Sequence, residues 1–452
     1  MKKWMTRASH GMAASLSIAL LSAPMVHASS TITITWLLPT DTEVDAYAHT
    51  VATQYEKENP GIKIDVITPG STAYNEKLLT MVAAGQTPDI FTDWANTGVY
   101  TIISHHLAQD LNPFFKADKI SSSFIPATYK KEYTEDNHLY GLPWLSNPTF
   151  IAYNETLFNK YHVPLPTTSW TDKSWTLNKL LADAKKLTHL TSNPKTSDWG
   201  VDLTPGSIGS LGWLWGVDPL NNKGGPTYTA AYRGGALTQT YATQPKEVEA
   251  MQWLADLSLK DHVMPDQGTL TAMSTTGNAF FSGHIAISEV AGWVWRQAAQ
   301  FQPKFKWGIV PIPYGPGGAD TAQREDNAFY LSSTSKHADA AFRFMVFATT
   351  GWGAQQLVKV GKIDPPNTNP KYLEEWVAGV DKIAGFSMKN SVFEQVFEGG
   401  VNRDFPDPTN LLNDSSDFGD PFTQLMSPVW IGRESAKQGL QAVQSAWQQV
   451  LQ

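Results

Sequence analysis

The sequence predicts an α/β protein with two lobes. Residues 31–91 are expected to form strand, helix, strand, helix and strand, because alternating apolar and polar residues twice give way to apolar residues at helical spacing. Strands separated by helices imply a parallel sheet with right-handed crossovers. At 452 residues the chain is too long for one hydrophobic core, and its length favours about two or three domains. Two is the simpler division.

The first lobe is predicted to begin with a strand at 31–36. A helix then runs to a stop at Pro60 and Gly61, a second strand occupies 62–66, and a helix from about Tyr74 to Ala84 leads to a third strand at 89–91. In such sheets ligands bind outside the carboxyl ends of the strands. This rule points to four residues that follow the first and third strands: Trp36, Asp93, Trp94 and Asn96.

The stretch 139–175 is predicted to carry the chain into the second lobe. Gly141 and Pro143 interrupt the preceding pattern, and the apolar run at 150–153 has the length of a strand. This run is expected to enter a new sheet. We therefore interpret the stretch as a crossover between domains.

The second lobe is predicted to continue with a helix at 177–187 and a glycine- and tryptophan-rich passage at 198–218. A long exposed excursion at 221–243 shows almost no apolar periodicity, and a helix follows at 248–257. Within 280–295, a helix end, a glycine, a strand and a Gly-Trp turn then succeed one another. That turn is a second candidate for the ligand cleft.

The chain is predicted to cross between the lobes about three times. Residues 307–313 suggest an edge or linking strand, because two prolines remove hydrogen-bond donors. Residues 327–331 return to the first lobe, a helix follows at 335–350, and the tail from 372 is helical. Several crossings make a hinge whose motion is a rotation, as a two-lobed ligand trap needs.

These crossings set the predicted boundaries. The first lobe comprises 29–144 and 330–371, and the second comprises 145–329 and 372–452. Residues 1–28 have the basic start, apolar centre and small-residue cleavage site of a signal peptide. No later stretch approaches about 18 uninterrupted apolar residues. We expect a soluble monomer, secreted or periplasmic, after the signal peptide is cleaved.

Composition excludes several classes of function. The absence of cysteine excludes disulfides, thiolate metal sites and a lipidated cysteine anchor. A net charge of −8 without a basic stripe makes nucleic acid and anionic membranes poor partners. The sequence has no His-Glu-x-x-His, Gly-x-Ser-x-Gly, Walker or Gly-x-Gly-x-x-Gly pattern. We therefore expect no catalytic residues, no metal and no cofactor. Residues 413–420 resemble a calcium loop but lack its terminal glutamate, so we interpret them as a turn.

Seventeen tryptophans are a high count, and a flat, rigid indole suits stacking against the apolar face of a sugar ring. About half of them are expected to be core residues. The candidates at strand ends or in loops are Trp36, Trp94, Trp144, Trp213, Trp215, Trp293, Trp295 and Trp352, with Trp293 the strongest. Carboxylates and amides are needed to orient the hydroxyl groups. The polar candidates are Tyr74, Asp93, Asn96, Asn147, Glu289 and Asp326, while Gly292 would let the backbone approach the ligand.

The order of these landmarks resembles a known family. The landmarks that carry the resemblance are a Gly-Leu-Pro step at 141–143, Tyr153-Asn154 before a Leu-Phe, prolines and a Trp-Thr before a helix, and an apolar strand ending at Gly292-Trp293. The sequence resembles the extracellular solute-binding proteins of sugar ABC transporters, the maltose/oligosaccharide-binding group. The resemblance covers nearly all of the mature chain. It implies a periplasmic-binding-protein fold with multiple hinge crossovers, an oligosaccharide held between the lobes, and presentation of the closed form to a membrane permease. The missing lipobox cysteine and the 221–243 excursion depart from that pattern.

Two alternatives stay open at the level of sequence. A secreted carbohydrate-active hydrolase would also be rich in tryptophan, and would need two carboxylates about 5 to 10 Å apart across the scissile bond. A binding protein for a peptide, polyamine or oxyanion is the other. An anion would favour clustered basic residues at the strand ends, whereas Arg296 and Arg324 are isolated.

Overall fold

The computed structural model describes residues 31–39, 41–94, 97–203, 210–221, 224–226, 239–274, 278–407 and 416–451. The predicted signal peptide and Asn96 lie outside these residues, as do parts of the 221–243 excursion and of the calcium-like segment. Across the described ranges, no helix combines the length and the apolar character that a membrane crossing requires.

Most strands belong to one mixed sheet. They are β1 Ile32–Leu37, β2 Ile62–Ile67, β3 Ile90–Thr92, β6 Gly141–Asn154, β7 Ile287–Ala291, β8 Trp307–Val310, β9 Gln323–Leu331 and β10 Phe405–Pro406. The order is β2-β1-β3-β9-β6-β7, with β10 beside β9 and β8 beside β6. Two short strands, β4 Thr134–Glu135 and β5 His138–Leu139, form a separate antiparallel pair.

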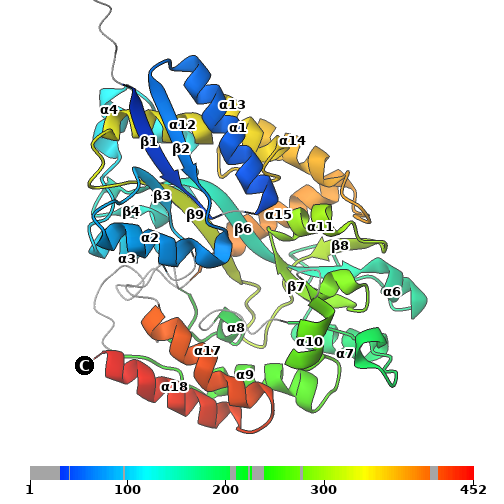
Figure 1. Cartoon of the computed structure of the whole chain (residues 1–452). Coiled ribbons are helices and arrows are strands. Elements are labelled where there is room, and N and C mark those ends of the chain that lie inside the picture. The colour runs from blue at the N-terminus through cyan, green and yellow to red at the C-terminus, as the bar shows by residue number, and fades with distance from the viewer. Residues whose placement is uncertain are drawn as a thin grey trace, which may run out of the picture.

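The opening of the chain forms the predicted parallel unit. β1 pairs in parallel with β2, from Ile32 opposite Ile62, and with β3 through Trp36 opposite Ile90. β9 runs antiparallel to β3, because it returns from the other lobe in the opposite direction. The sheet is therefore parallel at the β2 edge and mainly antiparallel beyond β3, where the short β10 still pairs in parallel with β9 (Figure 1).

β6 runs through both parts of the sheet. Its first half pairs with β9, from Gly141 opposite Tyr330 to Pro148 opposite Arg324. Its second half pairs with β7 on one side and β8 on the other. The sequence predicts only the run at 150–153 as a strand, whereas one buried 14-residue strand forms. Pro143 lies at a register shift, where its missing donor is tolerated.

The helices flank this sheet. Those before β6 are α1 Thr42–Glu58, α2 Tyr74–Ala83, α3 Val99–Ser104, α4 Asn112–Ala117 and α5 Ala127–Glu132. Those between β6 and β9 are α6 Glu155–Lys160, α7 Leu177–Leu187, α8 Ser210–Leu214, α9 Pro245–Leu259, α10 Gln267–Met273 and α11 Val294–Phe301. After β9 come α12 Ala338–Thr349, α13 Gly351–Lys359, α14 Pro370–Val380, α15 Asn390–Arg403, α17 Ser416–Trp430 and α18 Ala436–Val450. In Figure 1, α1, α12 and α13 lie near the β1–β2 edge, and α17 and α18 pack with α9 at the opposite end.

Aromatic residues fill two cores. In the first, the Trp36 indole meets Tyr47, Phe329 and Phe344 edge-on, with ring centroids 5.0 to 6.2 Å apart. In the second, Trp295 stacks on Trp376 at 5.8 Å. The first core includes the first half of β6 and the second core includes its second half with β7 and β8, so β6 connects the two cores.

Candidate functional site

The larger cavity beside the crossing strands has a volume of about 610 Å³. Its lining comes from the start of α1, from the segments before α2 and after β3, and from β6, α11 and β9. The residues are Asp41, Glu43, Ser71, Trp94, Asn147, Trp293, Arg296, Gln297, Gln300, Phe301, Glu325, Asp326, Asn327 and Asp407. Segments of both predicted lobes therefore face one space.

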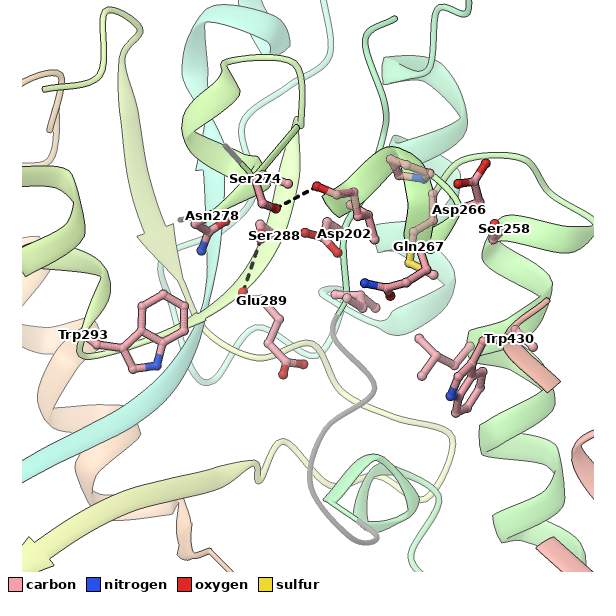
Figure 2. A pocket seen from close by; sticks show the side chains of 17 residues that line it. Asp202, Ser258, Asp266, Gln267, Ser274, Asn278, Ser288, Glu289, Trp293 and Trp430 are labelled. Atoms are coloured by element: carbon pink, nitrogen blue, oxygen red, sulfur yellow. Dashed lines mark hydrogen bonds between the residues drawn. The ribbon is translucent and has the colours of Figure 1, made fainter. Parts of the chain in front are cut away.

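A second cavity of about 290 Å³ shares Trp293 with the first. Asp202, Ser288, Glu289 and residues of α9 and α10 line it, and Trp430 of α17 lies on its far side (Figure 2). Figure 2 shows the Glu289 carboxylate directed into the space between Trp293 and Trp430. Because Trp293 borders both cavities, an elongated ligand would pass this indole.

Trp293 is positioned by a tight turn between β7 and α11. β7 pairs with β6, and Trp293 is the first residue before α11. A Cβ atom on Gly292 would lie 2.8 Å from Oδ1 of Asn147, so only glycine lets the turn pack this closely on β6. Gly292 thus brings Asn147 and Trp293 side by side in the larger cavity.

Two partly buried carboxyl groups lie on neighbouring strands in the smaller cavity. The segment at Asp202 runs parallel to β7: the Asp202 amide donates to the Ile287 carbonyl at 2.8 Å, and the Glu289 amide donates to the Asp202 carbonyl at 3.0 Å. Burial raises the pKa of Asp202 to about 6. Burial, and then the charges of Asp202 and Glu325, raise the pKa of Glu289 to about 8. Both groups are costly to ionise together.

β9 contributes an adjacent pair of acids to the larger cavity. Burial, followed by the charge of Asp407, raises the pKa of Glu325 to about 7. Asp326 is instead fully buried, accepts a hydrogen bond from Ser146 at 2.6 Å and forms an ion pair with Arg324. Asp326 therefore holds β9 to β6, whereas Glu325 faces the cavity, where the positive charge of Arg296 acts on it without forming a salt bridge among the described residues.

Five predicted site residues line the cavities. They are Trp94, Asn147, Glu289, Trp293 and Asp326. Gly292 lies behind them, and Asn96 is outside the described residues.

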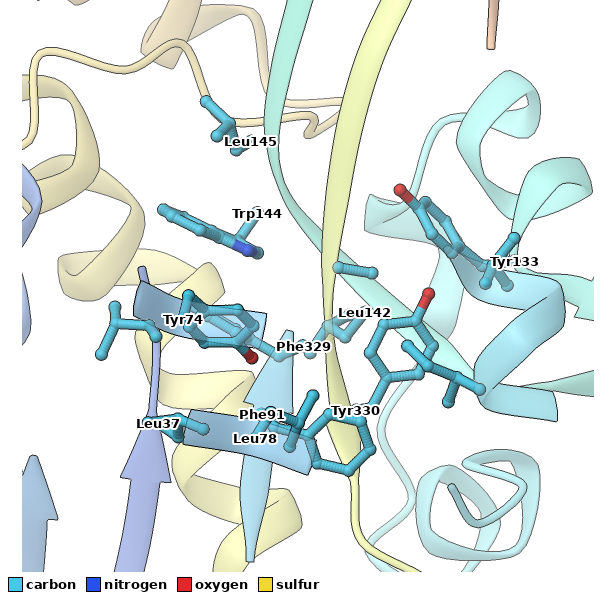
Figure 3. Close-up of a cluster of buried hydrophobic side chains, with 14 of the residues drawn as sticks. Leu37, Tyr74, Leu78, Phe91, Tyr133, Leu142, Trp144, Leu145, Phe329 and Tyr330 are labelled. Carbon is cyan, nitrogen blue, oxygen red and sulfur yellow. The ribbon is translucent and has the colours of Figure 1, made fainter. Parts of the chain in front are cut away.

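Four other predicted site residues, Trp36, Tyr74, Asp93 and Trp144, are buried in the core instead. Trp36 is 0% exposed, because its side chain lies on the face of β1 that packs against the helices. The Tyr74 hydroxyl donates to the Thr92 carbonyl at 2.7 Å, and Trp144 Nε1 donates to Thr92 Oγ1 at 3.1 Å while stacking on Phe329. Figure 3 shows Tyr74, Trp144 and Phe329 in one cluster. The buried Asp93 carboxylate accepts from the Ala328 amide at 2.6 Å, which ties β3 to β9.

The four remaining tryptophans that were predicted as site residues also lie outside both cavities. Trp213 is buried and donates to Asp218 at 3.0 Å, and Trp215 packs against Trp253. Trp295 points into the second core, because it is on the opposite side of α11 from the cavity. Trp352 is 38% exposed on α13 and stacks on Phe347. These four tryptophans were predicted to be exposed because they lie in loops or at helix ends. Packing buries all of them except Trp352.

The cavities contain functional candidates that the sequence analysis missed. Asp202 lines the smaller cavity with Glu289, Glu325 lines the larger cavity and its charge acts on Glu289, and Arg296 pairs with Asp41 across the larger cavity. Arg296 follows Trp293 by three residues, so its place on the same side of α11 was a usable signal. The sequence around Asp202 contains no such signal, because the place of Asp202 beside Glu289 depends on pairing with the distant strand β7. No group of three or more histidine or acidic side chains among the described residues is arranged to hold a metal.

Comparison with known proteins places the chain in a family. The family model for bacterial extracellular solute-binding proteins matches residues 39–350. A putative binding protein of Brucella abortus is 24% identical over 348 residues, which cover 75% of this chain and 77% of the relative.

Solved structures share the fold. An ABC substrate-binding protein from Listeria monocytogenes in complex with cycloalternan matches with a TM-score of 0.76 at 20% identity, covering 93% of this chain and 99% of that one. The maltose/maltodextrin-binding domain MalE from Bdellovibrio bacteriovorus, bound to maltotriose, matches with a TM-score of 0.69 at 16% identity, covering 93% and 99%. The predicted two-lobed α/β fold is confirmed by these matches.

Proposed function

The chain belongs to the bacterial extracellular solute-binding proteins, and from this premise we propose that it is the carbohydrate-binding component of an ABC importer. It traps an oligosaccharide between the two lobes by hinge closure and delivers it to the membrane permease. The family is a non-enzymatic part of a transporter, so the hydrolase alternative is set aside. We further propose that residues 1–28 are removed as a signal peptide and that the lobes divide as the sequence predicts.

The observation that carries this proposal is the pair of cavities that share Trp293 in their linings. Volumes of about 610 and 290 Å³ are close to the range of small-ligand sites, and the lining combines the indoles of Trp94, Trp293 and Trp430 with amide and carboxyl groups. Trp94 and Trp293 offer flat apolar surfaces for sugar rings, while Asn147 and Glu289 offer groups that bind hydroxyls. The neighbours bound to cycloalternan and maltotriose support a sugar as the ligand.

A thermal-shift screen of the mature chain against mono- and oligosaccharides tests the proposal. We expect the melting temperature to rise with at least one oligosaccharide, because a ligand that binds only the folded state stabilises it. Prolonged incubation with that sugar should leave it intact by chromatography. A screen in which peptides or other non-sugar solutes stabilise the protein and no sugar does would contradict the proposal.

A further inference from the structure

The two cavities are strongly acidic. Among the described residues, eight acidic side chains line them against one basic side chain, Arg296. Arg296 is itself paired with Asp41 at 2.7 Å. An anionic ligand would therefore meet repulsion rather than a free cation.

Several of these acids have structural partners. Asp41 and Asp266 cap helices, and Asp326 pairs with Arg324. Asp202 and Glu289 accept no side-chain hydrogen bond from the described residues, and Glu325 has only a 3.5 Å contact with Gln323. These three carboxyl groups, Asp202, Glu289 and Glu325, are defined here as the acidic triad.

Asn147 gives independent evidence for a ligand at this place. Its side chain lines the larger cavity, although the residue is only 4% exposed. Its amide group makes no hydrogen bond to another described residue. Its amide oxygen and nitrogen are therefore available at the cavity wall to a ligand that donates or accepts hydrogen bonds. β6 places Asn147 opposite Glu325 and Ile151 opposite Glu289, so the amide and the triad flank the same strand.

A neutral sugar does not resolve the repulsion within the triad. Hydroxyl groups donate hydrogen bonds to carboxylates but bring no charge, so carboxylates that raise one another's pKa remain costly to ionise. An ammonium group does bring that charge. The adjacent Trp293 suits it, because a cation beside an indole ring gains further attraction.

We propose that the ligand is an amino sugar, whose protonated amine is held by Asp202, Glu289 and Glu325 beside Trp293, while Asn147 binds its hydroxyl groups. This inference rests on the proposed function and narrows its class of ligand. It assigns the acidic triad the role of determining specificity.

Matched sugars that differ in one substituent test the inference. Isothermal titration at pH 7 compares glucosamine and its β-1,4 dimer with the N-acetylated and the parent hydroxyl forms. We expect the amino forms to bind about ten-fold more tightly, as about 1.4 kcal/mol of charge attraction would give. Glu289→Gln should abolish that preference. Glu249→Gln makes the same substitution at an exposed position on α9 outside both cavities, and should preserve the preference.

Proton release provides a readout that loss of packing would not mimic. Because the pKa of Glu289 is raised to about 8 beside Asp202 and Glu325, this carboxyl group is largely protonated at pH 7. An arriving ammonium favours the ionised form, so binding should release a proton. Arg296 is the one basic side chain among the described residues that line the two cavities, and it lies on the larger one. Titrations in two buffers of different ionisation enthalpy measure that proton.

The outcomes separate this inference from the proposed function. If neutral or N-acetylated sugars bind as tightly as the amino forms, or if Glu289→Gln leaves the preference intact, the amino-sugar inference is overturned and the sugar-binding function stands. If a linear diamine binds and no sugar does, both are overturned. Binding of a neutral oligosaccharide from the screen, with no response to any amino form, also overturns the inference.

Discussion

The Nε atom of Arg296 donates to Oδ2 of Asp41 at 2.7 Å, which joins α11 to the start of α1 across the larger cavity. Arg296 is 7% exposed, whereas the Asp41 side chain is 40% exposed. The other oxygen of Asp41 accepts from the Val44 amide at 2.9 Å and caps α1. One carboxylate therefore stabilises a helix and links segments of the two predicted lobes.

Asp41→Asn separates these two roles. Asparagine retains an oxygen for the cap but loses the charge that pairs with Arg296. We expect sugar affinity to fall about five-fold, since an ion pair with one exposed partner contributes about 1 kcal/mol. The melting temperature of the free protein should change little. Asp41→Ala, which removes the cap as well, should lower both; equal affinity of wild type and Asp41→Asn would show that the pair does not stabilise the bound form.

Trp293→Ala tests the indole that borders both cavities. If stacking contributes about 1 to 3 kcal/mol, a figure taken from aromatic stacking on nucleobases, sugar affinity should fall roughly five- to 150-fold. Trp447 is the matched packing control, because it is fully buried in α18 and donates to the Phe418 carbonyl at 2.8 Å. Trp447→Ala should lower the melting temperature instead. Calorimetric titration and thermal melts of both variants distinguish the roles, and unchanged affinity in folded Trp293→Ala would remove Trp293 from the site.

Gly292→Ala tests the close packing of the β7–α11 turn on β6. The added Cβ would lie 2.8 Å from Oδ1 and 3.0 Å from Cα of Asn147, so Asn147 or Trp293 must move. We expect a loss of about 1 to 3 kcal/mol in stability and weaker ligand binding. Gly379→Ala in α14 is the control, because its Cβ meets nothing within 4 Å, and it should stabilise by about 0.5 to 1 kcal/mol. Urea titrations measure both changes; a Gly292→Ala protein of full stability would contradict the packing argument.

Local patterns predicted the opening of the fold well. Alternation identified β1 and β2, and helical spacing placed a helix from about Tyr74 to Ala84, close to the observed Tyr74–Ala83. The same alternation held a warning about Trp36. It shares a face of β1 with Ile34, and both are fully buried against the helices, so the end of a strand does not by itself place a residue in the cleft.

Long-range pairing limited the prediction of the site. Gly292 and Trp293 were predicted, because a glycine after an apolar strand is a local signal. The acidic triad was not predicted as a unit, since Asp202, Glu289 and Glu325 come from three distant segments. Only the run at 150–153 of β6 was predicted as a strand, because Gly141 and Pro143 interrupt the preceding pattern, yet pairing with β9, β7 and β8 holds 141–154 as one strand.

Buried carboxyl groups give the free protein an unusual dependence on pH. Burial raises the pKa of Asp364 to about 8, with a further contribution from Glu398. Burial likewise raises the pKa of Asp404 to about 8 and, as the main cause, that of Asp93 to about 7. The usual pKa of an aspartate is 3.8, so the folded state binds more protons than the unfolded state between pH of about 4 and about 8.

We therefore expect the free energy of unfolding to fall as the pH rises from 5 to 8 and to level off above that, because each raised carboxyl group stabilises the fold only while it is protonated. Asp198 acts in the opposite sense. Burial raises its pKa, but hydrogen bonds from Lys160, Tyr161 and His284 lower it below the usual value, so its contribution to stability is lost only below about pH 4.

Asp364→Asn should reduce the slope of unfolding free energy between pH 5 and 8, because the asparagine does not titrate. Glu249→Gln on the exposed side of α9 should leave that slope unchanged. Urea denaturation at several pH values measures these slopes. Stability that rises from pH 5 to 8 would show that these carboxyl groups are ionised in the folded state and hydrated or paired in a way the structure does not contain.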